Sequence, residues 1–328
     1  MDEMIEKFMD QLREAMDIGR KAQVTKPENP INKIYVAGLG GSGIGANFVA
    51  SFVYELCPVP YLVGKGYNIP AYIDENTLFV ASSYSGNTEE TLESFGKAEK
   101  TGAKMMAISG GGKLIQQAKE KGYDFIQVPG DWASPRACLG YSVIQQLYML
   151  YKHGFIDGSF EKDLEKAIER LDNETDQIRE KAEKVAQILN NKIPIIYSED
   201  RYEPVAIRFR QQVNENSKML CWHHVIPEMN HNELVGWRNH NPDWAVVLFR
   251  SSDNHPRNAI RMDINKEIIS EYSDSFIEIQ AKGDSLIERS FYLVHFGDWI
   301  SWYLSQLQGR DAVEVKVIDY LKGELAKQ

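Results

Sequence analysis

A cluster of hydroxyl side chains in the first third of the chain has the residue types needed to bind a phosphate group. Ser83, Ser85 and Thr88 lie between an apolar run and a helical pattern, and Gly86 stands among them. The hydroxyl groups can donate hydrogen bonds, and glycine lets the backbone approach a ligand closely. The free N–H groups and the positive dipole end of the following helix would add further donors. The alternative interpretation is a helix N-cap with surplus hydroxyl groups.

A glycine-rich turn, Gly38-Leu39-Gly40-Gly41-Ser42-Gly43, lies upstream of this cluster and fits the pattern G-x-G-x-x-G. Such a turn between a strand and a helix can bind a dinucleotide, bind another anion, or be purely structural. A dinucleotide site needs an acidic residue at the end of the second strand. Here Tyr61-Leu62-Val63 runs into Gly64-Lys65-Gly66, without a carboxylate. We therefore expect no nicotinamide cofactor, and no cofactor of any other kind.

The second half contains titratable side chains in a different pattern. Between residues 221 and 233 there are three histidines and two glutamates, but the spacing is not HExxH, and Pro227 would break an aligning helix. We expect no metal site, and we expect His223 and His224 to make packing or polar contacts. Composition alone leaves Glu215 as either a general base or an exposed helix carboxylate. Arg208 and Arg210 are expected at the surface or at an interface.

Alternating strand and helix patterns must position these side chains. The predicted strands cover residues 34–38, 60–64, 77–82, 104–109 and 124–129, then 193–198, 245–250 and 276–281. The predicted helices cover residues 43–56, 89–101 and 113–121, then 205–219, 286–307 and 315–326. This alternation predicts an α/β protein with two doubly wound parallel sheets. The aromatic-rich stretch 291–303 is expected in the core or at a dimer contact.

The chain divides by its composition into four segments. An amphipathic N-terminal helix (1–30), a first α/β domain (31–158), a charged helical connector (159–191) and a second α/β domain with a C-terminal helix (192–328) are expected. A length of 328 residues suits two such domains.

Bulk properties exclude several classes of function. A formal charge of −10 argues against a nucleic-acid surface. No apolar run approaches the ~20 residues that span a bilayer, and the charged N-terminus lacks a signal peptide's apolar stretch. A cytoplasmic protein is therefore expected. The three cysteines are far apart, so neither a disulfide framework nor a zinc site is expected, only small buried residues.

Four segments in order resemble the sugar isomerase (SIS) domain family. The S-x-S-G-x-T turn at residues 83–88 is similar to its phosphosugar loop. GLGGSGIGA at 38–46, SPRACLGYS at 134–142, and NENSK at 214–218 followed by NHNE at 230–233 are similar to the bifunctional phosphoglucose/phosphomannose isomerases. The resemblance covers nearly the whole chain and both halves.

The resemblance implies roles for residues on the phosphate side of a site. Gly41 and Ser42 would line the sugar side of the phosphate pocket. Ser83, Ser85 and Thr88 would contact the phosphate. Because Glu199-Asp200 follows the first strand of the second half and would repel an anion, we expect one phosphate site per chain.

It also implies a set of reacting groups. Arg136 would lie near the substrate oxygens, and Glu215 would move the proton between C1 and C2. His231, from the neighbouring subunit of a homodimer, would assist ring opening. Lys322 would face the substrate, with Lys316 and Lys327 as alternatives.

The implied function is an aldose–ketose isomerase that interconverts glucose 6-phosphate and fructose 6-phosphate through an enediolate, in glycolysis or gluconeogenesis. Mannose 6-phosphate stays open as a second substrate, because residues 311–315 lack a threonine that the family links to it. The alternative is a non-catalytic phosphosugar-binding SIS protein, although no helix-turn-helix segment accompanies it. Amino-sugar phosphate chemistry would require an ammonia-producing domain that the chain lacks.

Overall fold

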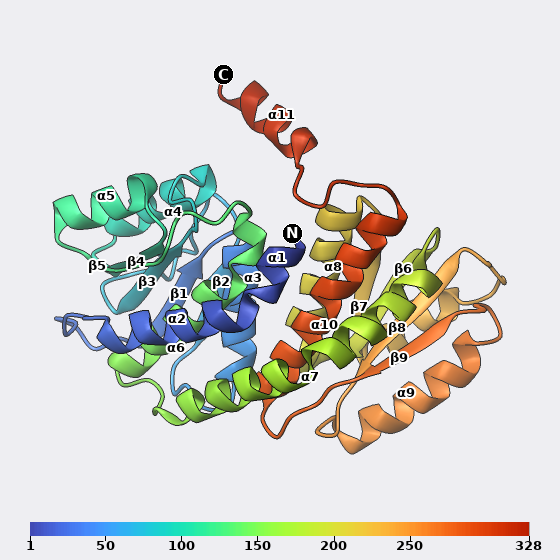
Figure 1. Ribbon diagram of the computed structural model, residues 1–328. Coiled ribbons are helices and arrows are strands. Elements are labelled where there is room, and N and C mark those ends of the chain that lie inside the picture. Colours follow the sequence, from blue (N-terminus) through green and yellow to red (C-terminus); the bar gives the residue numbers. More distant parts are fainter. Residues whose placement is uncertain (328) are drawn as a thin grey trace. The chain divides into compact units, whose positions relative to one another are not determined.

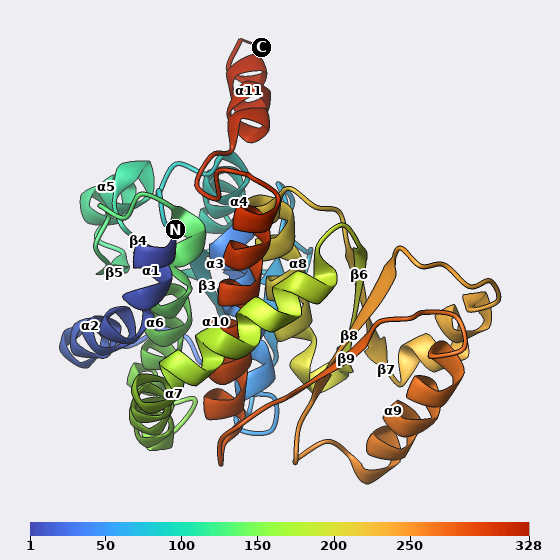
Figure 2. The same cartoon turned by 45° about the vertical axis from the view of Figure 1, so that its right-hand side comes forward.

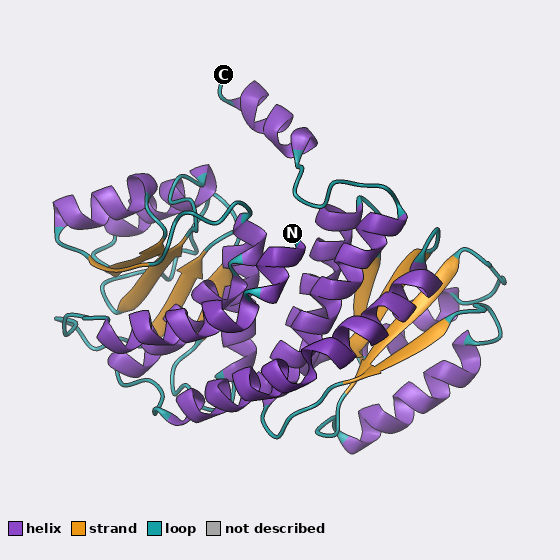
Figure 3. Ribbon diagram, in the orientation of Figure 1, coloured by secondary structure: helices purple, strands orange, loops and turns teal. Residues whose placement is uncertain are grey.

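The computed structural model describes residues 1–327 as two compact units, each built around its own sheet (Figures 1 and 3). The N-terminal unit contains residues 6–169 and 285–287. The C-terminal unit contains residues 1–5, 170–284 and the chain from 288 onward. The long helix α7 (Ser159–Leu189) passes from one unit to the other. The domain boundaries at 30, 158 and 191 stay predictions. In the described part of the chain, no helix combines the length and apolar composition of a membrane span.

The N-terminal unit has a five-stranded parallel sheet in the order β2-β1-β3-β4-β5. Its strands are β1 (Lys33–Ala37), β2 (Tyr61–Gly64), β3 (Thr77–Ser82), β4 (Lys104–Ser109) and β5 (Asp124–Gln127). Its helices are α2 (Phe8–Lys21), α3 (Gly40–Phe52), α4 (Glu89–Glu99), α5 (Gly112–Lys121) and α6 (Leu139–Lys152), and α1 (Asp2–Glu6) precedes them.

Helices cover both faces of this sheet, which is why its strands are apolar almost throughout. Alternate residues such as Tyr35, Phe79 and Met105 share one core cluster with α4 and α5. The intervening residues, such as Val36 and Val80, are also fully buried. They face the side on which α3 and α6 pack against each other.

The C-terminal unit has a four-stranded parallel sheet in the order β7-β6-β8-β9. Its strands are β6 (Ile193–Glu199), β7 (Trp222–Ile226), β8 (Trp244–Arg250) and β9 (Phe276–Gln280). Its helices are α8 (Glu203–Ser217), α9 (Pro256–Ile269), α10 (Leu286–Leu307) and α11 (Lys316–Leu325). The strand order second-first-third-fourth matches that of the first four strands in the N-terminal unit.

These sheets confirm the predicted α/β class with two doubly wound parallel sheets. Three elements were not predicted: α6, β7 and α9. Nearly all of α6 is buried, so its sequence has no polar face from which to read a helical period. The N-terminal helical region ends at Lys21, nine residues before the predicted end at residue 30.

Two smaller expectations also have outcomes. Phe291 and Trp299 of α10 are fully buried, so the aromatic-rich stretch belongs to the core. Of the cysteines only Cys138 is buried, whereas Cys57 and Cys221 are half-buried, which corrects the expectation for those two.

Candidate active site

Two helix N-termini meet at the carboxyl edge of the N-terminal sheet. Helix α3 begins just after β1 and α4 just after β3, and these strands are parallel neighbours. The Ser42 hydroxyl accepts a hydrogen bond from the Tyr84 N–H at 3.2 Å, which joins the two turns. A side chain at Gly38 would lie 2.8 Å from the carbonyl oxygen of Ser82, so the glycine turn packs directly against the end of β3. The two predicted phosphate-binding segments are therefore adjacent.

The hydroxyl-rich loop between β3 and α4 is organised by its own side chains. Ser83 is buried, and its Oγ lies 2.8 Å from Oγ1 of Thr88 and accepts the Gly86 N–H at 3.2 Å. Gly86 has a φ of +68°, and a side chain there would overlap the carbonyl of Gly111. Ser85 is exposed, and its Oγ accepts the Asn87 N–H at 3.2 Å. The loop conformation thus depends on a glycine and gathers hydroxyl groups at the start of a helix.

The N-cap alternative makes a specific demand on Thr88, which is the N-cap residue of α4. Its side chain accepts no hydrogen bond from the first turn of the helix. The hydroxyl group pairs with Ser83 instead. Because the Thr88 side chain does not accept from the N–H groups of the first turn, these groups can donate to an anion. This geometry favours the phosphate interpretation over a simple cap.

Arg136 lies on a short 3-10 helix (Pro135–Ala137) beside the glycine turn. A side chain at Gly41 would be 3.3 Å from the Pro135 oxygen and 3.6 Å from the Arg136 Cα. Arg136 is buried although a guanidinium stays charged at any physiological pH. The structure therefore places the backbone of Arg136 next to the glycine turn. Arg136, Gly41, Ser42 and the 83–88 loop share one region of the N-terminal unit.

Tyr84 links the loop to the segment that leads to Arg136. Its hydroxyl accepts the Trp132 N–H at 3.2 Å, and its carbonyl accepts the Gly110 N–H at 2.9 Å. Burial raises the pKa of this phenol above its ordinary value. A pocket opens here at the strand ends, lined among others by Ser42, Tyr84, Ser109, Pro135, Cys138 and Ser142. Tyr84 was not among the predicted site residues, although its place within the loop was a signal.

In the C-terminal unit, Glu215 lies in the last turn of α8. Two neighbouring side chains hold this turn against α10: Asn216 donates to the Ser301 hydroxyl at 2.9 Å, and the Ser217 hydroxyl donates to the Ser301 carbonyl at 2.7 Å. Asn214 donates to the Met219 carbonyl at 2.7 Å. The asparagines that flank Glu215 thus orient it through the backbone of the helix end.

Arg208 lies about two turns before Glu215 in α8. The expectation that it lies at the surface or at an interface was wrong. It is 2% exposed and forms a two-pronged ion pair with Asp298 of α10, with Nε–Oδ1 at 3.2 Å and Nη2–Oδ2 at 2.9 Å. A buried guanidinium requires such a partner. Asp298 comes from a helix 90 positions later, so local sequence could not reveal the pair.

His231 is exposed, at the end of a short 3-10 helix (Glu228–His231) that follows β7. The segment is fixed through Glu233, which accepts hydrogen bonds from the Tyr197 hydroxyl and from Trp222 Nε1. The His224 Nδ1 accepts the Val225 N–H at 2.8 Å, and His223 Nε2 lies 3.6 Å from a Glu203 oxygen. Within residues 1–327, no three His, Cys, Asp or Glu side chains gather as a metal site would require.

The predicted C-terminal lysine lies on α11, which has no buried side chain. Lys322 is exposed there, and its role stays a prediction. Lys218 was not among the predicted site residues; it adopts a left-handed conformation at the end of α8. Its Nζ donates to the carbonyls of Glu215 at 2.6 Å and Glu314 at 2.7 Å. Lys218 therefore ties the candidate base to the segment before α11, and its place in NENSK was the available signal.

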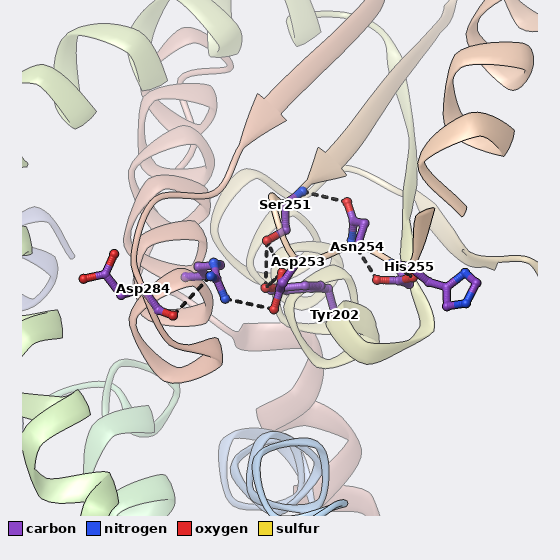
Figure 4. A network of polar contacts seen from close by, with 8 residues as sticks. Tyr202, Ser251, Asp253, Asn254, His255 and Asp284 are labelled. Atoms are coloured by element: carbon purple, nitrogen blue, oxygen red, sulfur yellow. Dashed lines mark hydrogen bonds and ion pairs between the residues drawn. The ribbon is translucent and has the colours of Figure 1, made fainter. Parts of the chain in front are cut away.

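The matching strand orders identify the counterpart of the hydroxyl-rich loop in the C-terminal unit. It follows β8 and contains residues 251–255. Figure 4 shows this loop filled by polar contacts. Asp253 accepts hydrogen bonds from the hydroxyls of Ser251 and Tyr202, the latter at 2.7 Å, and pairs with Arg289 at 2.9 Å.

Carboxylates of the chain itself thus occupy the donors of this second loop. Burial alone would raise the pKa of Asp253, but its hydroxyl donors and the charge of Arg289 bring that pKa below its ordinary value. Glu199, at the end of β6, accepts the His255 N–H at 2.9 Å at the start of α9. It also accepts Asn254 at 2.8 Å and Asn258 at 2.7 Å. These contacts support the expectation of a single phosphate site, in the N-terminal unit.

The chain matches two family models, and each describes a SIS domain. Residues 29–128 match the SIS domain, and residues 178–325 match the bacterial phospho-glucose isomerase C-terminal SIS domain. The C-terminal domain of glucosamine-fructose-6-phosphate aminotransferase from Francisella tularensis superposes with a TM-score of 0.77 at 13% identity, covering 94% of this chain and 97% of that one. At that identity the likeness shows the fold, which is that of a double-SIS protein.

Two full-length relatives narrow the class. The bifunctional phosphoglucose/phosphomannose isomerase of Caldicellulosiruptor bescii is 39% identical, covering 100% of this chain and 99% of that protein. The enzyme of the same name from Aquifex aeolicus is 36% identical, covering 93% of each. The chain belongs to the bifunctional phosphoglucose/phosphomannose isomerase family.

Proposed function

We propose that this protein interconverts glucose 6-phosphate and fructose 6-phosphate, with mannose 6-phosphate as a second aldose substrate. The observation that carries the proposal is the hydroxyl-rich loop at the start of α4, in which Thr88 leaves the helix uncapped and faces Ser83. In a member of this family, such a loop is suited to the phosphate of a sugar. We infer that the enzyme acts in the cytoplasm, in glycolysis or gluconeogenesis.

The proposed reaction needs one base, one group that handles the ring oxygen, and positive charge for the enediolate. We assign these roles to Glu215, His231 and Arg136, with Lys322 as a further cation. Ser83, Ser85 and Thr88 hold the phosphate, while Gly41 and Ser42 line its sugar side. Glu215 removes the proton from the carbon next to the carbonyl and returns it to the adjacent carbon.

We also propose a homodimer whose sites take His231 from the neighbouring subunit. Two observations support a second copy as the partner. Two apolar side chains on either side of β7 in the sequence are exposed, Leu220 before it at 86% and Val235, four residues after His231, at 67%. On α11, Val317, Tyr320 and Leu321 lie at helical spacing and are exposed at 82%, 70% and 57%. Such faces are typical of surfaces that a partner covers.

The direct test is to incubate the purified protein with glucose 6-phosphate or mannose 6-phosphate and to measure fructose 6-phosphate. Prolonged EDTA treatment is expected to leave the rate unchanged, because every proposed role belongs to a protein side chain. A sample treated with EDTA and then supplied with zinc serves as the comparison. Activity that disappears with EDTA and returns with zinc would make the His223–Glu233 segment a metal site and refute the assignment.

Removing two hydroxyl donors tests the phosphate loop. Ser85→Ala combined with Thr88→Ala removes donors to a charged group, each worth roughly 1.5–3 kcal/mol. Fructose 6-phosphate, measured by isothermal titration calorimetry, should bind at least tenfold more weakly. Thr101→Ala is the matched control, because that hydroxyl donates to the Ala98 carbonyl at the other end of α4. Unchanged affinity in a folded double variant would mean that the loop is only a helix cap.

A further inference from the structure

The N-terminal helix α2 packs along α6, and both views show the two helices side by side (Figures 1 and 2). A polar side chain lies in the middle of this contact. Gln11 is 1% exposed, and its amide is satisfied at both ends. Its Nε2 donates to the Ala137 carbonyl at 2.9 Å, and its Oε1 accepts the Gly140 N–H at 2.8 Å. Burying a glutamine is unfavourable unless its hydrogen bonds are made, so this contact has a defined geometry.

Both partners of Gln11 belong to the segment that carries Arg136. Ala137 directly follows Arg136, and Gly140 lies in the first turn of α6, where backbone N–H groups have no partner within the helix. Gly140 is shaped for the contact, because a side chain there would lie 2.7 Å from Gln11 Oε1 and 2.8 Å from a methyl group of Leu12. Gln11 therefore holds two points of the backbone just after Arg136.

We propose that Gln11 is a positioning residue that sets the location of Arg136 in the active site. The inference rests on the proposed role of Arg136. Without the glutamine amide, a buried carbonyl and a buried N–H would both lack their partner, and residues 135–140 would shift to satisfy them. A displacement of ~1 Å at a substrate-positioning group can lower activity by about 100-fold. The N-terminal helix, which precedes the matched SIS domain (29–128), thereby becomes part of the catalytic apparatus.

The same helix pair offers a matched control. Gln145 of α6 is fully buried, and its Nε2 donates to the Ala15 carbonyl of α2 at 2.7 Å. It joins α2 to α6 as Gln11 does, but it does not bond to residues 135–140. Replacing either glutamine with methionine removes a buried amide of similar size. A purely structural role predicts that both variants lose folding stability but keep their kcat/KM at a temperature where each is folded.

The experiment measures kcat and KM for fructose 6-phosphate isomerisation at a temperature where circular dichroism shows each variant folded. Gln11→Met is expected to lower kcat/KM at least tenfold, and Gln145→Met less than twofold. Gln11→Glu keeps the acceptor for Gly140, but its carboxyl group can donate to the Ala137 carbonyl only when protonated, so its loss of kcat/KM relative to wild type is expected to grow as the pH rises. This variant also provides the test if Gln11→Met does not fold.

A double-mutant cycle with Arg136→Ala completes the test. If Gln11 acts by positioning Arg136, then Gln11→Met should cost less than twofold further activity once the arginine is gone, because the two effects share one group. Equal losses in the two methionine variants, or full additivity with Arg136→Ala, would overturn the inference. Near-wild-type activity of Arg136→Ala alone would instead refute the proposed role of Arg136, on which the inference depends.

Discussion

Glu215→Gln is expected to lower kcat by about 10²–10⁴-fold, because the amide keeps the shape of the side chain but cannot accept the proton. Fructose 6-phosphate should still bind with nearly wild-type affinity, since the proposed phosphate contacts lie elsewhere in the chain. Both quantities can be measured on one preparation, by steady-state kinetics and by calorimetry. A fall in kcat without a fall in affinity is the signature of a group that acts on the reacting carbons.

The structure indicates that this substitution leaves the helix end intact. The turn around Glu215 is held by Asn216 and Ser217, through bonds to Ser301, and by Lys218, whose Nζ donates to the Glu215 carbonyl. Glu203→Gln is a suitable control, because it changes a carboxylate at the opposite end of the same helix. Near-wild-type turnover in Glu215→Gln would refute the base assignment.

Mixed dimers are expected to recover activity that neither parent variant has. Glu215→Gln and His231→Ala homodimers should each be nearly inactive. When a one-to-one mixture is unfolded and refolded, about half of the dimers contain one chain of each kind. If each site takes Glu215 from one subunit and His231 from the other, one site of a mixed dimer collects both substitutions and its other site collects neither.

About a quarter of all sites should then be intact, as a consequence of two-fold symmetry. Wild-type protein taken through the same unfolding and refolding gives the recovery against which this fraction is measured. If His231 served the site of its own chain, every site would carry one substitution and no activity would return. The recovered fraction thus distinguishes a shared site from a self-contained one. The exposed position of His231, with Val235 nearby in sequence, is the structural reason to expect sharing.

Much of the fold was predictable because its signals are local. Strands β3 and β4 are covered by helices on both faces, so their sequences are short apolar runs whose ends coincide with the predicted ones. The glycine turn and the hydroxyl-rich loop were also recognisable, since residues a few positions apart make their contacts. The Ser83–Thr88 hydroxyl pair is an example. Where burial was complete on all sides, as in α6, no periodicity remained and the helix was missed.

Some contacts could be found only in the tertiary structure, because their partners lie far apart in sequence. The buried pair of Arg208 with Asp298 and the contacts of Gln11 with residues 137 and 140 join elements about 90 to 130 positions apart. Local sequence carries no signal for such pairs, because the partners meet only after the sheets and helices have packed. The second loop is a further example. The strand order identifies residues 251–255 as the counterpart of the hydroxyl-rich loop, and the contacts of Asp253 fill it together with those of Glu199. The sequence by itself determined which groups could do chemistry, and packing decided which of them are held in place.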